Sequence, residues 1–155
     1  MSSGLSWRCL AFAELSPEDL YAALDLRIRV FVVEQNCPYR ETDGLDREAL
    51  HLLGEREGKL LATARLLAPG LAYPEAAIGR VVSCPDARGE GHGRALMARA
   101  IEECETRWPG PIQIGAQRYL ERFYGSFGFV QVGVPYLEDG IPHVHMVRGG
   151  TPSRL

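Results

Sequence analysis

A glycine-rich loop carries the strongest chemical pattern in this chain. It runs from Arg88 to Arg94 (RGEGHGR), after an apolar stretch at residues 78–83 and before a segment with helically spaced apolar residues. Glycines let a backbone approach a ligand closely, and the first N–H groups of a helix have no internal partners. Because these N–H groups and the helix dipole both attract negative charge, the pattern favours phosphate binding.

Two common phosphate-binding motifs do not fit this loop. The dinucleotide fingerprint G-x-G-x-x-G, read from Gly89, would place Arg94 at its last glycine. The P-loop motif G-x-x-x-x-G-K-(S/T) requires a lysine that the loop lacks. A helix start with spare glycines is the remaining alternative. Three glycines at alternate positions each cost backbone entropy, which favours a loop that binds a ligand.

The segments around the loop predict an α/β chain. Apolar runs and turn residues indicate strands at residues 5–13, 51–56, 59–67, 76–83, 112–116, 129–132 and 144–148. Helices are expected at residues 16–35, 93–107 and 119–127, the first beginning with Ser16 as N-cap and Pro17 in the first turn. The order β-α-β-β-β-α-β-α-β-β indicates one mixed sheet flanked by helices.

Two local expectations accompany this order. On the first helix the spacing predicts one apolar stripe, formed by Leu20, Leu24, Ile28 and Phe31. Residues 134–142, which contain Glu138-Asp139-Gly140, are expected to form a long connection between the last two strands.

Length and composition narrow the class of protein. A chain of 155 residues suits one domain, spanning 1–155, with a full core. A net charge of −3 gives no overall attraction to nucleic acid, and no apolar run is long enough to span a membrane. Cys9, Cys37, Cys84 and Cys104 have no zinc spacing, so no metal is expected. The start, MSSGLSWRCLAF, lacks the pattern of a secretory signal, and a cytoplasmic protein is expected.

The loop and a later segment together resemble the GCN5-related N-acetyltransferases (GNAT). The family signature (Q/R)-x-x-G-x-(G/A) is matched by Arg88, Gly91 and Gly93, and a second family element, F-Y-x-x-x-G-F, by the segment from Phe123 to Phe129. The similarity extends to the ElaA-like subfamily, through the stretches RVFVVEQNCPY, IGRV, GAQ and EDGIPH. It covers nearly the whole chain and implies the GNAT fold, with a mixed, mostly antiparallel sheet flanked by helices.

The resemblance implies acetyl-CoA as co-substrate. The loop N–H groups would hold the pyrophosphate, and the backbone of residues 81–83 would pair with the pantetheine arm as an added strand. The residues expected to bind the coenzyme are Val81, Val82, Ser83, Arg88, Gly89, Glu90, Gly91, His92, Gly93, Arg94 and Tyr124. The acceptor would be a small-molecule or peptide amine, acetylated directly in a ternary complex, and a homodimer is left open.

Acetyl transfer from a thioester to an amine needs a neutral amine, N–H donors for the oxyanion and a proton for the leaving thiolate. The backbone of residues 81–83 is expected to supply the donors. Tyr124 is expected to act as the general acid, because in this fold its helix follows a strand that splays away from the central one. An aromatic core residue beside Phe123, Phe127 and Phe129 is the alternative for Tyr124.

The general base is left open by the sequence. Residues 78–83 carry no carboxylate, so the candidates are Glu34, Glu75, His51 and His143, or a chain of waters. Each side chain also has a purely structural explanation, as a helix end, a solvated charge or a strand start. Glu34 and His143 are the expected catalytic partners of Tyr124.

Three further points concern the acceptor and the reaction class. Acidic residues in segments that flank the acceptor side favour a cationic amine, although they also fit separate solvated charges: Glu34, Asp43, Glu138 and Asp139. Cys84 is assigned to packing, because no His-Asp pair accompanies it. An acyl-homoserine-lactone synthase and a coenzyme A-binding module without catalysis are the alternative functions.

Overall fold

The computed structural model describes residues 4–149, within which seven strands form one sheet in the order β1-β2-β3-β4-β5-β7-β6. Neighbouring strands are antiparallel except β4 and β5, which run parallel. The expected mixed, mostly antiparallel sheet is therefore confirmed. Two parts of the chain lie outside the described residues. They are residues 1–3, which begin the segment expected to lack a secretory signal, and residues 150–155 of the tail.

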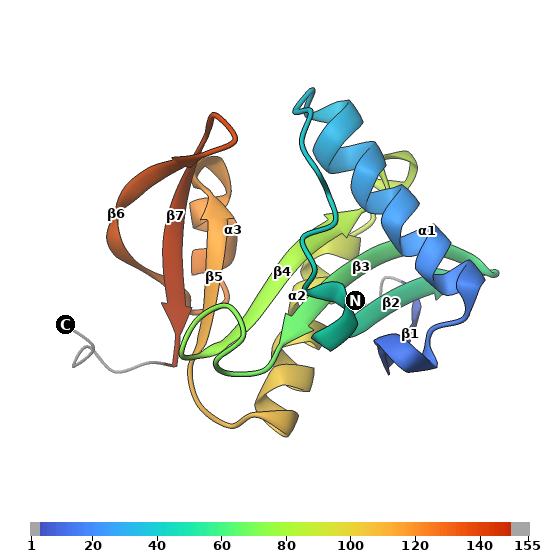
Figure 1. Ribbon diagram of the computed structural model, residues 1–155, viewed down its shortest axis with the longest axis horizontal. Coiled ribbons are helices and arrows are strands. Elements are labelled where there is room, and N and C mark those ends of the chain that lie inside the picture. The colour runs from blue at the N-terminus through green and yellow to red at the C-terminus, as the bar shows by residue number, and fades with distance from the viewer. Residues whose placement is uncertain (1–3, 150–155) are drawn as a thin grey trace.

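The N-terminal half of the sheet consists of β1 (Ser6–Ala11), β2 (Leu50–Arg56), β3 (Lys59–Leu67) and β4 (Ala76–Ser83). Helix α1 (Pro17–Arg27) lies over one face of this half, as Figure 1 shows. Its start follows the sequence signal: the Ser16 hydroxyl accepts from the Asp19 N–H (3.0 Å), and the Asp19 carboxylate accepts from the Ser16 N–H (3.2 Å). This capping box satisfies two otherwise unpaired donors.

The apolar stripe expected on α1 is wrong. The buried side chains of this helix are Ala23, Leu26 and Arg27, and Ile28 is 41% exposed. After Arg27 the helix widens into a π-helical segment, Ile28–Glu34, so that its turns no longer follow a 3.6-residue period. The spacing of apolar residues could not predict that a charged side chain, Arg27, would be buried on this helix.

The C-terminal half contains β5 (Ile112–Gln117), β6 (Val130–Glu138) and β7 (Ile141–Arg148). The long connection expected at residues 134–142 is wrong, because β6 continues to Glu138 and turns tightly through Asp139-Gly140 into β7. Asp139 and Gly140 both have positive φ, which suits this two-residue turn. Gly133 and Pro135 are residues typical of loops, so the sequence did not indicate a strand here. They are tolerated because β6 lies at the edge of the sheet.

Helices α2 (His92–Arg107) and α3 (Glu121–Gly125) lie on the face opposite α1 (Figure 1). The side chains expected on the inner face of α2, including Met97, are buried in the main core. That core joins both halves of the sheet, because it contains Leu52 and Ile78 from one half and Ile112 and Met146 from the other.

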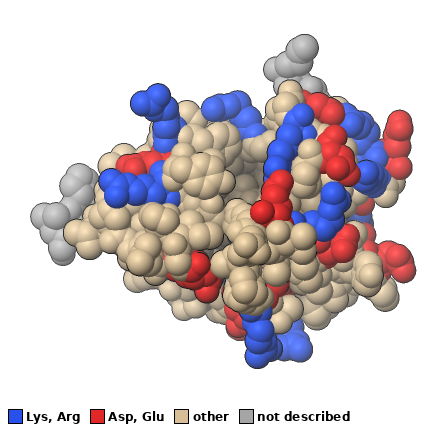
Figure 2. All heavy atoms as spheres, turned by 90° about the horizontal axis from the view of Figure 1, so that it is seen from above, with Lys and Arg blue, Asp and Glu red and all other residues tan. Residues whose placement is uncertain are grey.

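Two structural observations bear on membranes and nucleic acid, one from the helices and one from the face seen in Figure 2. Among residues 4–149, no helix is long and apolar enough to cross a bilayer. On the face seen in Figure 2, acidic and basic side chains are interspersed and do not form a large patch of one sign. Nucleic-acid binding would need such a basic patch.

Candidate active site

The site lies where β4 and β5 separate. The two strands pair only at Ala76–Ile112 and Ala77–Gln113, so β4 has no ladder partner on this side from residue 78 onward. Figure 1 shows the strands diverging from this point. The gap holds a cavity of about 640 Å³, which reaches the face where α1 and the π-helical segment lie.

A smaller cavity of about 180 Å³ opens from the same gap toward α2 and α3. Five residues line both cavities: Val81, Val82, Ser83, Leu120 and Tyr124. The two cavities therefore adjoin at the gap, one toward each face of the sheet. This arrangement offers one ligand an approach from the α2 face and a second ligand an approach from the α1 face.

Several residues named from the sequence meet in the larger cavity. Its lining includes Glu34, Val81, Val82, Ser83, Arg88, Tyr124, Glu138, Asp139 and His143. The other loop residues stay outside it. Gly93 lines the smaller cavity, whereas Gly89, Glu90, Gly91, His92 and Arg94 line neither.

The glycine loop forms the start of α2 as the sequence predicts. Gly91 is the N-cap with φ of 83°, a left-handed conformation that favours glycine, and no side chain caps the first turn. The first N–H groups of α2 therefore have no capping side chain and suit an anion. His92 points inward, 2% exposed, with Nε2 3.4 Å from the Glu90 carboxylate, so only its backbone is available to a ligand.

Arg88 and Glu34 form a bidentate ion pair between the loop and the π-helical segment, with two N–O distances of 2.6 Å. The hydrogen bonds from Arg88 lower the pKa of the exposed Glu34 carboxyl group. A carboxylate with a lowered pKa is a weak base, so this geometry disfavours Glu34 as the group that deprotonates an amine.

Tyr124 lies on α3 beneath the gap. It is 7% exposed and contacts the edges of Phe123 and Phe129, at centroid distances of 5.1 and 6.3 Å. Burial raises the pKa of its phenol to about 12, so the phenol keeps its proton at neutral pH. Tyr124 is thus packed in the core and also lines both cavities; the packing explanation describes its ring, and the acid role stays a prediction.

His143 has a defined tautomer. Its Nδ1 lies 2.7 Å from the backbone oxygen of Ile141, which can only accept a hydrogen bond, so Nδ1 carries the hydrogen. In the neutral ring Nε2 is then an acceptor. This nitrogen lies 3.8 Å from the Glu138 carboxylate, at the β6–β7 turn.

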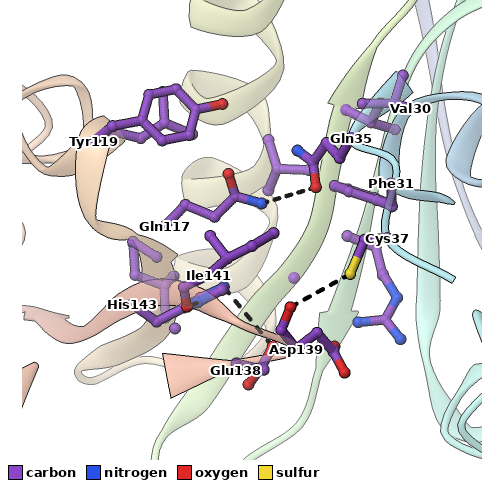
Figure 3. A pocket seen from close by; sticks show the side chains of 18 of the residues that line it. Val30, Phe31, Gln35, Cys37, Gln117, Tyr119, Glu138, Asp139, Ile141 and His143 are labelled. Atoms are coloured by element: carbon purple, nitrogen blue, oxygen red, sulfur yellow. Dashed lines mark hydrogen bonds and ion pairs between the residues drawn. The ribbon is translucent and has the colours of Figure 1, made fainter. Parts of the chain in front are cut away.

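The acceptor end of the cavity is acidic. Glu138 and Asp139 are exposed at the turn, and within residues 4–149 no arginine or lysine lies within ion-pair distance of either. Figure 3 shows two contacts that cross this end of the cavity, Gln117 with Gln35 and Cys37 with Asp139. The first is an amide–carbonyl hydrogen bond of 3.1 Å, and the second joins the Cys37 thiol to a backbone oxygen at 3.6 Å.

The remaining candidates lie away from the cavity. Glu75 is buried at the start of β4, and His51 is buried with Nε2 2.8 Å from the Asp46 backbone oxygen. Asp43 pairs with Arg65 at 2.7 Å, and Cys84 is buried in a second apolar cluster. Within residues 4–149, no group of three or more His, Cys, Asp or Glu side chains is arranged to hold a metal ion.

Several residues of this cavity carry no motif that predicts a role for them. Gln35 and Gln117 bridge its two sides, and Arg80 and Tyr39 line it beside a buried carboxylate, Glu41. Gln35, Tyr39, Arg80 and Gln117 do fall in the stretches that carry the subfamily resemblance, which is the only signal that pointed to them.

A splayed sheet with a glycine loop at the start of α2 defines an acyl-CoA-dependent acyltransferase as the class of protein. Residues 15–148 match the family model described as an acetyltransferase (GNAT) domain. The chain belongs to the GNAT acetyltransferase family, and within it to the ElaA-like proteins.

Relatives of known sequence and structure agree with this. Protein ElaA of Escherichia coli is 46% identical over 147 residues, covering 93% of this chain and 96% of that protein. Its crystal structure superposes with a TM-score of 0.87, covering 93% of this chain and 99% of that one. A crystal structure of an acyl-CoA N-acyltransferase from Pseudomonas aeruginosa is 49% identical, with the same coverage and a TM-score of 0.89.

A more distant likeness concerns the alternative function. The CoA-dependent acyl-homoserine lactone synthase BjaI, solved with SAM and isopentyl-CoA, has a TM-score of 0.78 at 17% identity. This likeness covers 97% of this chain and 85% of that one, and it shows a shared fold alone.

Proposed function

We propose that this enzyme transfers the acetyl group of acetyl-CoA to a primary amine, directly, in a ternary complex. The observation that carries the proposal is the pair of cavities that adjoin at the gap in the sheet, one toward each face, with Tyr124 and the free edge of β4 in the lining of both. The coenzyme enters between α2 and α3, and the amine enters from the α1 face. The whole chain acts as one domain, in the cytoplasm.

Coenzyme binding follows from the loop and the strand edge. The N–H groups at the start of α2 hold the pyrophosphate. The pantetheine amides pair with the backbone of residues 81–83, because that edge of β4 has no ladder partner. Arg88 sits where it can exchange its partner Glu34 for a phosphate, since both are anions that a guanidinium binds in bidentate fashion.

The reaction then needs a base, an oxyanion site and an acid. His143 Nε2 takes a proton from the ammonium form of the acceptor, and the neutral amine attacks the thioester carbonyl carbon. Backbone N–H groups of β4 stabilise the oxyanion. The attacking nitrogen passes its second proton to water, the C–S bond breaks, and the sulfur leaves as a thiolate that accepts a hydrogen bond from Tyr124.

The pKa of Tyr124 defines what that hydrogen bond does. A value of about 12 exceeds that of an ordinary thiol, about 8.5, so full proton transfer to the thiolate is uphill. Tyr124 therefore stabilises the leaving group mainly as a donor, and the thiolate takes its proton from solvent or from the protonated His143.

The acceptor is a cationic amine, because Glu138 and Asp139 lie at the mouth of the cavity and, within residues 4–149, have no arginine or lysine partner. Small molecules and exposed lysine or N-terminal amines both meet this requirement. The lactone-synthase alternative is tested with the same assay, by offering S-adenosylmethionine with an acyl-CoA.

Replacing Tyr124 with phenylalanine tests the chemical step. We expect a kcat lower by about ten- to a thousand-fold with a thermal midpoint nearly unchanged, because only the hydroxyl is lost. The measurement is thiol release from acetyl-CoA in an amine screen, with Tyr119→Phe as the control for an exposed phenol of the same cavity. A Tyr124→Phe enzyme with normal kcat would contradict the proposed hydrogen bond from Tyr124 to the leaving thiolate.

Replacing Gly91 with valine tests the coenzyme site. The added side chain fills the space where a phosphate approaches, so acetyl-CoA affinity in calorimetry should fall strongly. Gly58→Val is the matched control: Gly58 also has positive φ and open space around it, but lies in the β2–β3 turn. Equal affinities for these two variants would place the pyrophosphate elsewhere.

A further inference from the structure

Arg80 occupies an unusual position in the wall of the cavity. It lies within β4, yet its φ is 51°, a left-handed conformation that non-glycine residues rarely adopt. The pairing of β3 with β4 passes from Thr63–Val82 to Arg65–Gly79, so that Arg80 and Val81 together oppose one residue of β3. Such a bulge leaves one residue outside the ladder and turns its backbone groups away from the neighbouring strand.

The side chain of Arg80 is tethered through one edge of its guanidinium group, formed by Nε and Nη2. Its Nε donates to Glu41 Oε2 (2.6 Å), and Nη2 donates to the backbone oxygen of Glu41 (3.0 Å). Nη2 also lies 3.4 Å from the carboxylate of Asp43. Two contacts to one residue fix the guanidinium in position and orientation, which a single charge contact would not do.

Glu41 is itself held rigidly. It is 5% exposed, and its Oε2 also accepts from Arg27 Nε (2.6 Å), while Oε1 accepts from the Tyr39 hydroxyl (2.8 Å). Arg27 is fixed in turn by Asp46 at 2.9 Å. The tether of Arg80 therefore ends in a buried network that joins α1 and the loop after the π-helical segment to β4.

We propose that Arg80 is a positioning residue: its tether to Glu41 holds the β4 bulge in the left-handed conformation that aims the backbone N–H groups of Arg80 and Val81 at the thioester carbonyl. This inference rests on the proposed acetyl transfer and adds to it the device that sets the oxyanion site. Without the tether, an L-residue at this position would relax toward ordinary strand geometry. The bulge would then realign with β3 and withdraw its donors.

Three possible roles of Arg80 predict different results for variants that lack its side chain. If the guanidinium itself contacted the substrate, every residue without it would be equally impaired. If the network served stability alone, its loss would lower the unfolding midpoint and leave recognition of the carbonyl unchanged. If Arg80 acts through the backbone, glycine should be better than alanine, because glycine adopts positive φ without a tether.

The experiment compares two ligands by calorimetry, acetyl-CoA and S-ethyl-CoA. They match in size, but the thioether lacks the carbonyl oxygen, so the ratio of their Kd values reports the contact to that oxygen. For the wild-type protein we expect acetyl-CoA to bind roughly two- to ten-fold more tightly, the range of one hydrogen bond. Arg80→Gly should keep most of this ratio, and Arg80→Ala should bring it close to one.

Matched controls come from Glu57, which also has positive φ (53°) but lies in the β2–β3 turn. Glu57→Gly and Glu57→Ala should both keep the wild-type ratio. If Arg80→Ala does not fold, Arg80→Ser and Arg80→Asn repeat the comparison, because asparagine tolerates the left-handed region better than serine does. The acceptor assay should rank the variants in the same order by kcat, with the KM for acetyl-CoA changed less.

Equal ratios in Arg80→Gly and Arg80→Ala would overturn the inference, as would a wild-type protein that does not distinguish the two ligands. Both results leave the proposed function standing, because coenzyme binding itself is retained. A wild-type protein that binds neither ligand would overturn the proposed function, and this inference with it.

Discussion

The larger cavity is a cleft between two walls, one formed by β4 and the other by β5 and β7, and the two walls are held in different ways. The β4 wall is held by ion pairs, in which Arg27 and Arg80 converge on Glu41 and Arg65 converges on Asp43 and Asp46. The β5–β7 wall is held by rings: Tyr136 stacks on His145 at 4.5 Å and on His143 at 5.7 Å. Tyr73 meets the edge of His145 from the loop before β4.

The two walls also differ in the kind of group that each is proposed to offer to the reaction. The β4 wall offers backbone groups, and the other side offers the side chains of His143 and Tyr124. A side chain that does chemistry is fixed well by packing, because the rings around it set its rotamer. A backbone donor has no rotamer, and long side chains anchored elsewhere must fix the strand itself. Changes of charge should therefore damage one wall and changes of volume the other.

The largest effect should follow from Glu41→Ala in the β4 wall. It leaves the buried guanidinium of Arg27 without one of its partners and frees Arg80, so we expect a loss of about 3–5 kcal/mol in the free energy of unfolding. Urea unfolding measures it. Glu102→Ala is the control, because that side chain is 69% exposed in its contact with Arg99, and the change should stay within about 0.5 kcal/mol. Similar losses in the two variants would show that the network does not support this wall.

A smaller effect should follow from Gly115→Ala in the opposite wall. A Cβ there would lie 2.9 Å from the Tyr136 hydroxyl and 3.2 Å from that of Tyr73, so the rings must shift, at a cost of about 1–3 kcal/mol. Gly79→Ala is the matched control in the β4 wall, since its Cβ would meet nothing within 4 Å.

Tyr136→Phe, which removes the closer hydroxyl, should restore part of the stability lost in Gly115→Ala. Denaturant midpoints of the two single variants and the double variant measure this coupling. Additive losses would mean that Tyr136 does not pack against Gly115 in solution.

The smallest effect should be the loss, in acid, of the stability that the Asp43 carboxylate contributes. Burial alone would raise the pKa of Asp43, but the hydrogen bonds from Arg65 and from the Leu45 N–H outweigh it and lower the pKa to about 2. A carboxyl group whose pKa is lower when folded stabilises the fold above its unfolded value of 3.8, and this contribution is lost as the pH falls from about 4 to 2.

Asp43 should thus contribute to the acid response of the β4 wall, whereas the phenol of Tyr136, with a pKa raised by burial to about 12, does not titrate in this range. Thermal midpoints between pH 6 and 2.5 should fall less steeply for Asp43→Asn than for the wild-type protein. Tyr136→Phe should follow the wild-type slope. Parallel curves for all three proteins would contradict the assignment of Asp43 to the acid-sensitive wall.

The sequence was informative where local signals and burial agree. The strands β3 and β4 were predicted with their observed bounds, because each is an apolar run between turn residues. The start of α2 at the glycine loop was likewise predicted. Edge strand β6 was cut short, because its exposed side chains give no alternation and Gly133 and Pro135 resemble a loop.

For the candidate site too, some residues could be predicted from the sequence and others could not. Tyr124, Arg88 and the β4 edge were named from motifs, and all of them line the larger cavity. The tether of Arg80 to Glu41 could not be predicted, because it joins residues 39 positions apart and depends on the backbone conformation of a single bulge. The pairing of Glu34 with Arg88, across 54 positions, was missed for the same reason.

The short β4–β5 ladder has a mechanical consequence. Within residues 4–149, two residue pairs join the halves of the sheet, and the main core that bridges them lies on the α2 face. On the α1 face, the hydrogen bonds Gln35–Gln117 and Cys37–Asp139 cross the cleft. We expect the sheet to flex most easily about its core side, and a pantetheine arm bound along β4 as proposed would act as an eighth strand that limits this motion.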